Sequence, residues 1–442
     1  MKQFFKFMFA SFFGTFFSII MSGIFLFVIF FAMLAGVLNS TDKEQKQISK
    51  LENNTILHIT LNGPISDRTS ENPFENFDFT TFESSNNIGL DKILAAIEKA
   101  KKDDRIEGIY LDLSFLSAGM ATVEEIRAAL TDFKTSGKWI ISYSEIYTQG
   151  TYYLASVADK IYVNPVGIVE LRGLATELMF FKNMLAKLEI DVQIIRHGKF
   201  KSAVEPFMLE KMSDSNRKQL EKILNTAWGS MIGKIAASRS IETATINKLA
   251  DGLEIREAKD ALKHNFVDGV LYKDELLAVL REKLGLEEND DIASIGLGKY
   301  SKIKLKDSSQ EKFEDKIAVI YARGTIVSGK GSKDEMGSET ISKAIREARL
   351  DEDVKAIVLR VNSGGGSALA SDVMWRETTL AKAAKPFVVS MGDVAASGGY
   401  YIACAADKIV ASEKTITGSI GVFGIIPNME GFFNHKMGIT FD

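Results

Sequence analysis

The chain has 442 residues, of which 25% are charged and 46% are hydrophobic, a balance typical of globular proteins and not of disordered chains. Its 54 basic and 58 acidic residues give a formal charge of −4, so we expect no nucleic-acid partner. The single cysteine, Cys404, excludes an internal disulfide framework, and four histidines leave little room for a histidine metal cluster.

The amino-terminal segment is strongly apolar. Residues 7–38 form a run of 32 positions without a charge, whereas a membrane-spanning helix needs about 20 residues. A secretory signal has a shorter apolar core followed by a small-x-small cleavage site. We therefore predict that residues 1–40 are a retained anchor that contacts the lipid bilayer through residues 7–38. A cleaved signal and a buried soluble helix are the alternatives.

The charges around this run predict its orientation. Lys2 and Lys6 precede it, and the positive-inside rule then leaves the short amino terminus in the cytoplasm. The remainder, beginning with a linker at 41–54, is expected outside the cytoplasm, which in a bacterium means the periplasm.

The rest of the chain contains an internal repeat with an offset of 248 residues. Two pairs of segments share this offset: 109–114 (IYLDLS) with 357–362 (IVLRVN), and 152–161 (YYLASVADKI) with 400–409 (YYIACAADKI). Chance would not hold one offset over such a distance, so the chain has two copies of one unit.

Within each copy, apolar strands alternate with helices. In the first copy, helical spacing at residues 90–97 precedes a continuous apolar run at 106–113, and the second copy has the equivalent run at 354–361. Strands that are apolar on both faces predict parallel sheets flanked by helices, an α/β fold. An amphipathic stripe at 220–236 predicts one long helix for packing or subunit contact.

We expect the first copy at 55–285, a polar linker at 286–315 and the second copy at 316–442. A second copy of equal length would extend past residue 540, so this copy is expected to be incomplete at its carboxyl end.

Two glycine-rich turns distinguish the second copy. Residues 363–367 (SGGGS) follow a buried strand, where a glycine run can aim backbone N–H groups at a ligand, although a plain tight turn is the alternative. Ser397, followed by Gly398 and Gly399, lies between an apolar strand and an apolar helix. This position suits an activated nucleophile with a neighbouring oxyanion donor, but helix N-caps have the same pattern.

A serine nucleophile needs a base, and histidine is a poor candidate. His435 is the only histidine in the second copy, and it lies on a polar stretch. A lysine can act as base if burial lowers its pKa. Lys201 is a candidate because small and apolar residues follow it, but the residues alone do not select it among the many lysines.

Four motifs occur in order along the chain: 200–207 (FKSAVEPF), 362–367 (NSGGGS), 393–401 (DVAASGGYY) and 417–424 (TGSIGVFG). Together they closely resemble the signal peptide peptidase A family in its long, two-copy form. The resemblance implies two tandem repeats of the Clp protease/crotonase fold, membrane attachment and a homo-oligomer, expected to be a tetramer. It also implies degradation of remnant signal peptides.

The same resemblance implies a role for each site residue. Ser397 would be the nucleophile and Lys201, supplied by the first copy, its base. Ser419 would help hold the lysine amine, and the N–H groups of Gly365 and Gly398 would form the oxyanion hole. The family usually has proline where Gly364 stands here, so this turn is expected to be looser.

We therefore interpret the chain as a membrane-anchored, single-pass serine-type endopeptidase with a Ser–Lys dyad. It would lie in the bacterial inner membrane with its catalytic part in the periplasm, and would degrade cleaved signal peptides and other short apolar peptides without a metal or organic cofactor. A crotonase-type acyl-coenzyme A enzyme and a non-catalytic membrane scaffold are the alternatives.

Overall fold

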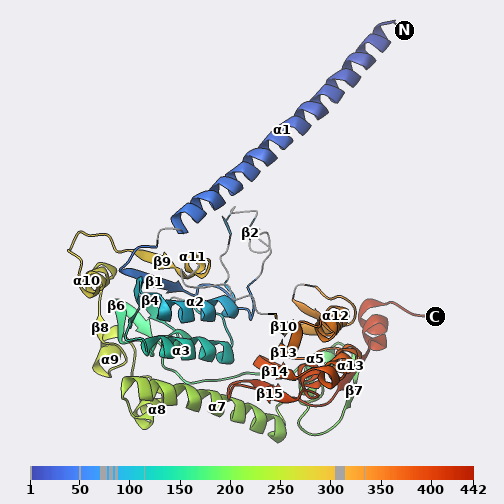
Figure 1. The fold of residues 1–442 in the computed structure, drawn as a ribbon. Helices are drawn as coiled ribbons and strands as arrows, with labels where there is room; N and C mark the ends of the chain where they lie inside the picture. Colours follow the sequence, from blue (N-terminus) through green and yellow to red (C-terminus); the bar gives the residue numbers. More distant parts are fainter. Residues whose placement is uncertain are drawn as a thin grey trace.

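A computed structural model describes residues 2–48, 51–69, 77–78, 83–84, 88–113, 115–303, 314–332 and 334–442. The chain forms one long amino-terminal helix and two sheet-containing bodies, which lie side by side in Figure 1. The first body contains the strands up to β9 other than β2, β3 and β7, and the second contains the strands from β10 onward.

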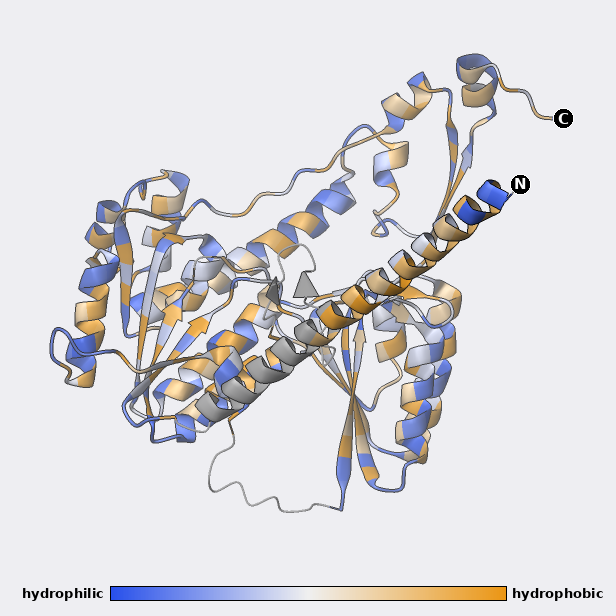
Figure 2. Cartoon of the chain, turned by 90° about the horizontal axis from the view of Figure 1, so that it is seen from above, coloured by the Kyte–Doolittle hydropathy of each residue, from blue (hydrophilic) through white to orange (hydrophobic). Residues whose placement is uncertain are grey.

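The amino-terminal helix α1 (Lys2–Ile48) projects away from both bodies (Figure 1). Its segment Lys2–Val28 is long and apolar enough to cross a membrane, and none of it is buried against the rest of the chain. Figure 2 shows this segment as a largely hydrophobic rod. The helix continues to Ile48, so the segment expected to be a linker at 41–54 begins as helix.

The first sheet has the strand order β8-β6-β5-β4-β1-β9 and its pairs are parallel. The predicted parallel α/β architecture is therefore confirmed for this copy. Helices α2 and α3 carry Ile93, Ile97 and Leu130 into the largest hydrophobic core, against Ile109 of β4. The strands are β1 (Thr55–Thr60), β4 (Ile106–Asp112), β5 (Trp139–Tyr147), β6 (Lys160–Val169), β8 (Gly269–Val270) and β9 (Ser294–Gly296).

Several helices surround this sheet. They are α2 (Leu90–Lys102), α3 (Met120–Lys134), α4 (Gln149–Ala155), α7 (Asp214–Arg239), α8 (Thr243–Asp251), α9 (Ala258–Lys263), α10 (Lys273–Leu284) and α11 (Leu297–Ser301). The predicted long helix is α7, whose residues Met231, Ile232 and Ile235 are buried in the first core. A separate two-stranded pair joins β2 (Phe77–Asp78) to β3 (Glu83–Ser84).

The expectation of a plain linker at 286–315 is wrong in part. Residues 294–301 form β9 and α11, and β9 extends the first sheet by pairing with β1. Tyr300 is fully buried, and its hydroxyl donates to Asp103 at 3.0 Å. The polar composition of this stretch did not indicate the three-residue strand β9, because its partner β1 lies far away in the sequence.

The second sheet has the order β10-β13-β14-β15, with β16 also paired to β14, and these pairs are parallel too. Its strands are β10 (Lys316–Arg323), β13 (Val354–Ser363), β14 (Phe387–Ala396), β15 (Lys408–Val410) and β16 (Ile416–Gly418). Helices α12 (Ser338–Leu350), α13 (Ala368–Ala384) and α14 (Gly398–Ala403) flank it and share a second hydrophobic core. A short pair, β11 (Thr325–Val327) and β12 (Glu335–Gly337), and a π-helix (Phe432–Met437) complete this half.

One strand pair crosses between the two copies. β7 (Asp191–Arg196) belongs to the first copy in sequence, but it pairs antiparallel with β17 (Phe423–Asn428) of the second. Figure 1 shows β7 and α5 (Lys182–Lys187) lying with the second body, while α7 returns beneath both. This crossing brings the segment between β7 and α6 (Glu205–Met208), which contains Lys201, to the second sheet.

Candidate active site

Ser397 occupies a strained turn between β14 and α14. Its backbone angles are φ 54° and ψ −117°, and a positive φ of this kind is unfavourable for a residue with a side chain. Its N–H donates to Gly418 O at 2.9 Å, and its carbonyl accepts from Tyr401 N at 2.9 Å. The predicted strand-to-helix turn is confirmed, since β14 ends at Ala396 and α14 begins at Gly398.

The hydroxyl of Ser397 is not used to cap this helix. No capping hydrogen bond joins its side chain to α14, so the alternative interpretation of Ser397 as an ordinary N-cap is not supported. The hydroxyl instead lies 3.1 Å from Lys201 Nζ. The turn therefore presents the side chain to another segment of the chain.

Lys201 is the residue that contacts the hydroxyl of Ser397. Its side chain is 6% exposed, and Nζ donates to Ser419 O at 2.5 Å and to Ser419 Oγ at 3.1 Å in addition to its contact with Ser397. Burial lowers the pKa of Lys201 from its usual value, because desolvation disfavours the charged amine. The contacts are hydroxyl and carbonyl oxygens.

Ser419 reaches the lysine because β16 runs beside β14. The pairs Ala395–Thr417 and Ala396–Gly418 align the two strands, and Thr417 Oγ1 donates to Ala395 O at 2.7 Å. Ser419 follows with a φ of 48°, a second strained residue beside the site. The structure thus brings Lys201, Ser397 and Ser419 together.

The segment carrying Lys201 is held by Glu205, to which sequence analysis assigned no role. Glu205 is fully buried and accepts from Ser213 Oγ at 2.6 Å and from Asn216 Nδ2 at 3.0 Å. Burial alone would raise the pKa of Glu205, but these hydrogen bonds outweigh it and lower the pKa. A carboxylate four residues after Lys201 thereby fixes this segment to the start of α7.

The two expected oxyanion glycines lie next to each other. Gly365 has a φ of 96°, and a Cβ added to it would lie 2.6 Å from Gly398 N. Gly398 is the first residue of α14, where N–H groups have no partner within the helix. The N–H of Gly365, however, donates to Ser363 Oγ at 3.1 Å. Sequence analysis did not single out Ser363, although it stands in the NSGGGS motif.

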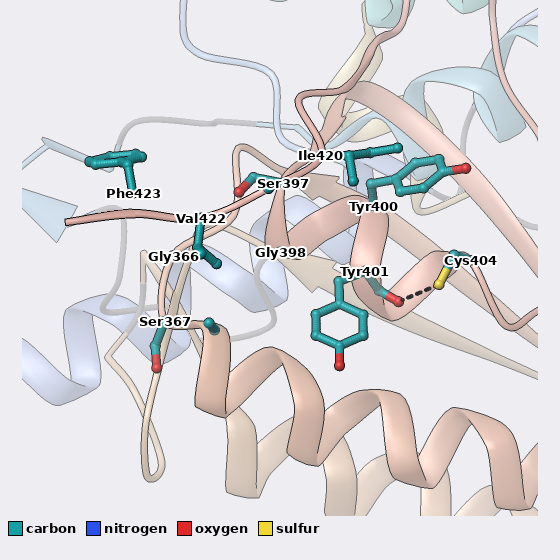
Figure 3. A pocket seen from close by; sticks show the side chains of 12 residues that line it. Gly366, Ser367, Ser397, Gly398, Tyr400, Tyr401, Cys404, Ile420, Val422 and Phe423 are labelled. Carbon is teal, nitrogen blue, oxygen red and sulfur yellow. Dashed lines mark hydrogen bonds between the residues drawn. The ribbon is translucent and has the colours of Figure 1, made fainter. Parts of the chain in front are cut away.

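A pocket opens beside Ser397 (Figure 3). Its volume is about 600 Å³. On one side lie Tyr400 and Tyr401 of α14 and Cys404, which directly follows this helix. On the other side lies the segment that carries Ile420, Val422 and Phe423. Most of these side chains are apolar, so the pocket favours an apolar group placed against the serine.

The remaining candidates lie elsewhere. His435 is exposed and contacts Glu189, as its polar surroundings predict. In the part of the chain that the structure describes, no group of three or more His, Cys, Asp or Glu side chains is placed to hold a metal ion. The chemistry available around Ser397 is therefore that of hydroxyls, one buried amine and backbone N–H groups.

Comparison with known proteins matches this arrangement to a peptidase family. The profile described as Peptidase family S49 matches residues 132–287 and 379–442, which include Lys201, Ser397 and Ser419. The chain belongs to peptidase family S49. This membership is consistent with the Clp protease/crotonase-like fold expected from the sequence, and with the parallel sheets flanked by helices described above.

Three relatives extend the comparison. Protease 4 of Salmonella typhi is 41% identical over 350 residues, covering 76% of this chain and 56% of that protein. Protease 4 of Haemophilus influenzae is 37% identical over 362 residues, covering 79% and 58%. The chloroplastic serine protease SPPA of Arabidopsis thaliana is 34% identical over 379 residues, covering 84% and 54%. The chain thus spans a little more than half the length of these relatives.

Proposed function

We propose that this chain is a serine-type endopeptidase in which Ser397 is the nucleophile and Lys201 the general base. The observation that carries the proposal is the 3.1 Å approach of a buried lysine amine to a serine hydroxyl on a strained turn. Membership in a peptidase family and similarity to two enzymes named Protease 4 support it.

The neutral form of Lys201 fits its surroundings. A neutral amine has two N–H donors and one lone pair. Ser419 O and Ser419 Oγ can accept the two N–H groups, which leaves the lone pair for the hydroxyl hydrogen of Ser397. The lowered pKa of Lys201 increases the fraction of amine in this form at neutral pH.

The reaction follows from this arrangement. As Ser397 Oγ attacks the carbonyl carbon of a peptide bond, its proton passes to Lys201 Nζ. The resulting ammonium returns a proton to the leaving amine, the C–N bond breaks, and an ester to Ser397 remains. Water then attacks the ester with the same amine as base, giving a free carboxylate and regenerating the serine.

The N–H groups of Gly398 and Gly365 would stabilise the oxyanion of both tetrahedral intermediates. The N–H of Gly365 now donates to Ser363 Oγ. To stabilise the oxyanion, it must donate to the substrate oxygen instead, or to both oxygens at once. Catalytic hydrogen bonds often reach their final geometry only with substrate bound.

The substrates are extended, apolar peptides, including signal peptides already released from their precursors. The apolar pocket beside Ser397 suits such chains. The copies at 55–285 and 316–442 act together, since the lysine comes from one and the serine from the other. By family resemblance, the protein assembles as a homo-oligomer, a tetramer.

The helix α1 anchors the protein in the bacterial inner membrane as a single span, with the catalytic part in the periplasm. The apolar segment Lys2–Val28 and the lysines at its start support this arrangement.

A fluorophosphonate probe tests the nucleophile directly. It should attach to Ser397 in the full chain, and Ser397→Ala should lose both the label and hydrolysis of an apolar peptide. A label on Ser419 instead would exchange the roles of the two serines. A chain that takes no label, hydrolyses no peptide and keeps its biological activity after Ser397→Ala would favour an acyl-coenzyme A enzyme or a scaffold.

A further inference from the structure

We propose that Asp393, a residue of the second copy, is a positioning residue for Ser397. It fixes the bulge of β14 to the amino terminus of helix α3 in the first copy. The proposal rests on the proposed function, because it assigns Asp393 a role in aligning the nucleophile.

Strand β14 contains a bulge just before Ser397. Val361 of β13 pairs with Met391 of β14, and Ser363 pairs with Ala395. An advance of two residues along β13 therefore corresponds to an advance of four residues along β14. The extra residues lie at 392–394. A bulge redirects the residues that follow it, and its own backbone groups lose their ladder partners. Whatever holds this bulge also sets the direction in which Ser397 points.

Side chains replace the missing ladder partners. Val394 N donates to Asn362 Oδ1 at 3.2 Å, and Thr415 Oγ1 donates to Gly392 O at 2.8 Å. Both partners belong to the second copy. The third anchor is Asp393, and its partner lies 271 residues earlier in the chain.

That partner is Thr122, in the first turn of α3. Thr122 N donates to Asp393 Oδ1 at 2.9 Å, and Thr122 Oγ1 donates to Asp393 Oδ2 at 2.6 Å. The first N–H groups of a helix have no partner within it, and a carboxylate is favourable there. Asp393 therefore caps a helix of the other copy with both of its oxygens.

The repeat shows that this cap replaces a local one. With the offset of 248, Gly119 corresponds to Ser367 and Thr122 to Ala370. Ser367 caps its own helix α13 by accepting from Ala370 N. At the equivalent place α3 has Gly119, which has no side chain, and a Cβ there would collide with the carboxyl group of Asp393. In the first copy, α3 has no local side-chain cap, and Asp393 of the second copy takes that place.

Neighbouring ion pairs hold the same surfaces together. Arg360 of β13 binds Asp67 at 2.8 Å and Glu125 of α3 at 2.7 Å. Asn362, which accepts from Val394 N of the bulge, donates to Asp67 Oδ2 at 2.9 Å. The bulge is thus linked to the first copy on two sides, through Asp393 directly and through Asn362.

A purely structural role would also explain this contact, if Asp393 served only to stabilise α3. The pair Asp393→Ala and Asp393→Ala/Gly119→Ser separates the two roles. The second substitution gives α3 the local cap that Ser367 gives α13, and it does not restore the link to the bulge. If Asp393 only stabilises α3, the double variant regains activity. If Asp393 positions Ser397, the double variant regains thermal stability without regaining activity.

We expect Asp393→Ala to lower kcat on the order of 10- to 100-fold, the usual consequence of a misplaced reacting group, with KM changed by less than about 2-fold. Gly119→Ser in the same chain should restore the melting temperature but not kcat. Ser230→Ala, which removes a different hydrogen bond between the copies, to Glu413, is the matched control and should retain wild-type kcat. Recovery of kcat in the double variant, or full kcat in Asp393→Ala, would overturn the proposal.

Hydrogen exchange separates this proposal from the proposed function. Asp393→Ala should accelerate amide exchange in residues 391–397, whether or not the chain hydrolyses peptides. Unchanged exchange there would refute the proposal that Asp393 holds the bulge of β14 in place. The wild type could show no Ser397-dependent hydrolysis while exchange still accelerates in Asp393→Ala. In that case the peptidase assignment fails, but the link between Asp393 and the bulge stands.

Discussion

Lys201 Nζ lies 3.1 Å from Ser397 Oγ, although 196 residues separate the two in the chain. Two strand pairings produce this contact. β7 leaves the first copy to pair with β17, and β16 pairs with β14 directly before the serine. The proposed base and the proposed nucleophile therefore come from different copies of the repeat but from one chain.

Replacing either member of this pair should abolish peptide hydrolysis. Lys201→Ala and Ser397→Ala should each reduce kcat about 10⁴-fold or more, because base and nucleophile act as one unit. For the same reason, the double variant should be little worse than either single one. Kinetics on an apolar peptide test this, and strictly additive losses would show that the two residues act independently.

The pH dependence should follow the amine of Lys201. Only its neutral form can accept the serine proton, and burial lowers its pKa in the folded protein. kcat/KM should therefore rise as pH increases through this lowered pKa. Lys201→Arg keeps a positive charge but does not deprotonate in this range, so it should be inactive at every pH. Near-normal turnover of Lys201→Arg would rule out lysine as the base.

The same lowered pKa has a consequence for stability. Between the folded pKa of Lys201 and its unfolded value of about 10.4, the unfolded chain binds more protons, so stability rises with pH. The lowered pKa is therefore a cost in stability at pH values below the folded pKa of Lys201. Lys201→Met removes this cost and should raise the melting temperature, by less as pH rises. Lys187→Met, at an exposed lysine, is the control. If Lys201→Met raised the melting temperature equally at all pH values, the gain would not come from the lowered pKa of Lys201.

Two adjacent glycines should respond differently to a methyl group. Gly365→Ala places a Cβ at positive φ, 2.6 Å from Gly398 N and 2.8 Å from Ser397 Cβ. It should cost about 1–3 kcal/mol and displace the serine, with loss of activity. Gly364→Ala meets no described atom within 4 Å and has no positive φ, so it should be tolerated. Thermal melting and kcat of the two variants test this, and equal effects would contradict it.

The orientation of α1 can be tested in cells. If Lys2–Val28 spans the membrane with its amino terminus inside, a protease added to intact spheroplasts should digest the portion after Ile48. A cytoplasmic protein should stay intact in the same sample. Protection of the portion after Ile48 until the cells are lysed would reverse the assigned topology.

Much of the fold follows from local patterns in the sequence. The apolar run at 106–113 predicts a buried strand and the spacing at 90–97 an amphipathic helix, and both are present as β4 and α2. These predictions succeed because side-chain periodicity depends on neighbours only a few residues away. The strand-to-helix turn at Ser397 is predictable for the same reason.

The sequence did not reveal the contacts between segments that lie far apart in the chain. β9 and α11 lie in a stretch whose polar composition favours a linker, and their formation depends on β1, Asp103 and other distant partners. Likewise, nothing near Gly119 in the sequence indicates that its helix is capped by Asp393.

The sequence by itself determined the repeat, the anchor-like segment and the parallel α/β pattern, and its family motifs pointed to Ser397 and Lys201 as the proposed nucleophile and base. Only the tertiary structure decided that the two meet within one chain, that Lys201 is buried enough for its pKa to fall, and that Gly365 N–H is bonded to Ser363. The physical reason is that desolvation and hydrogen bonding depend on which distant segments pack together, and no local pattern of residues encodes that.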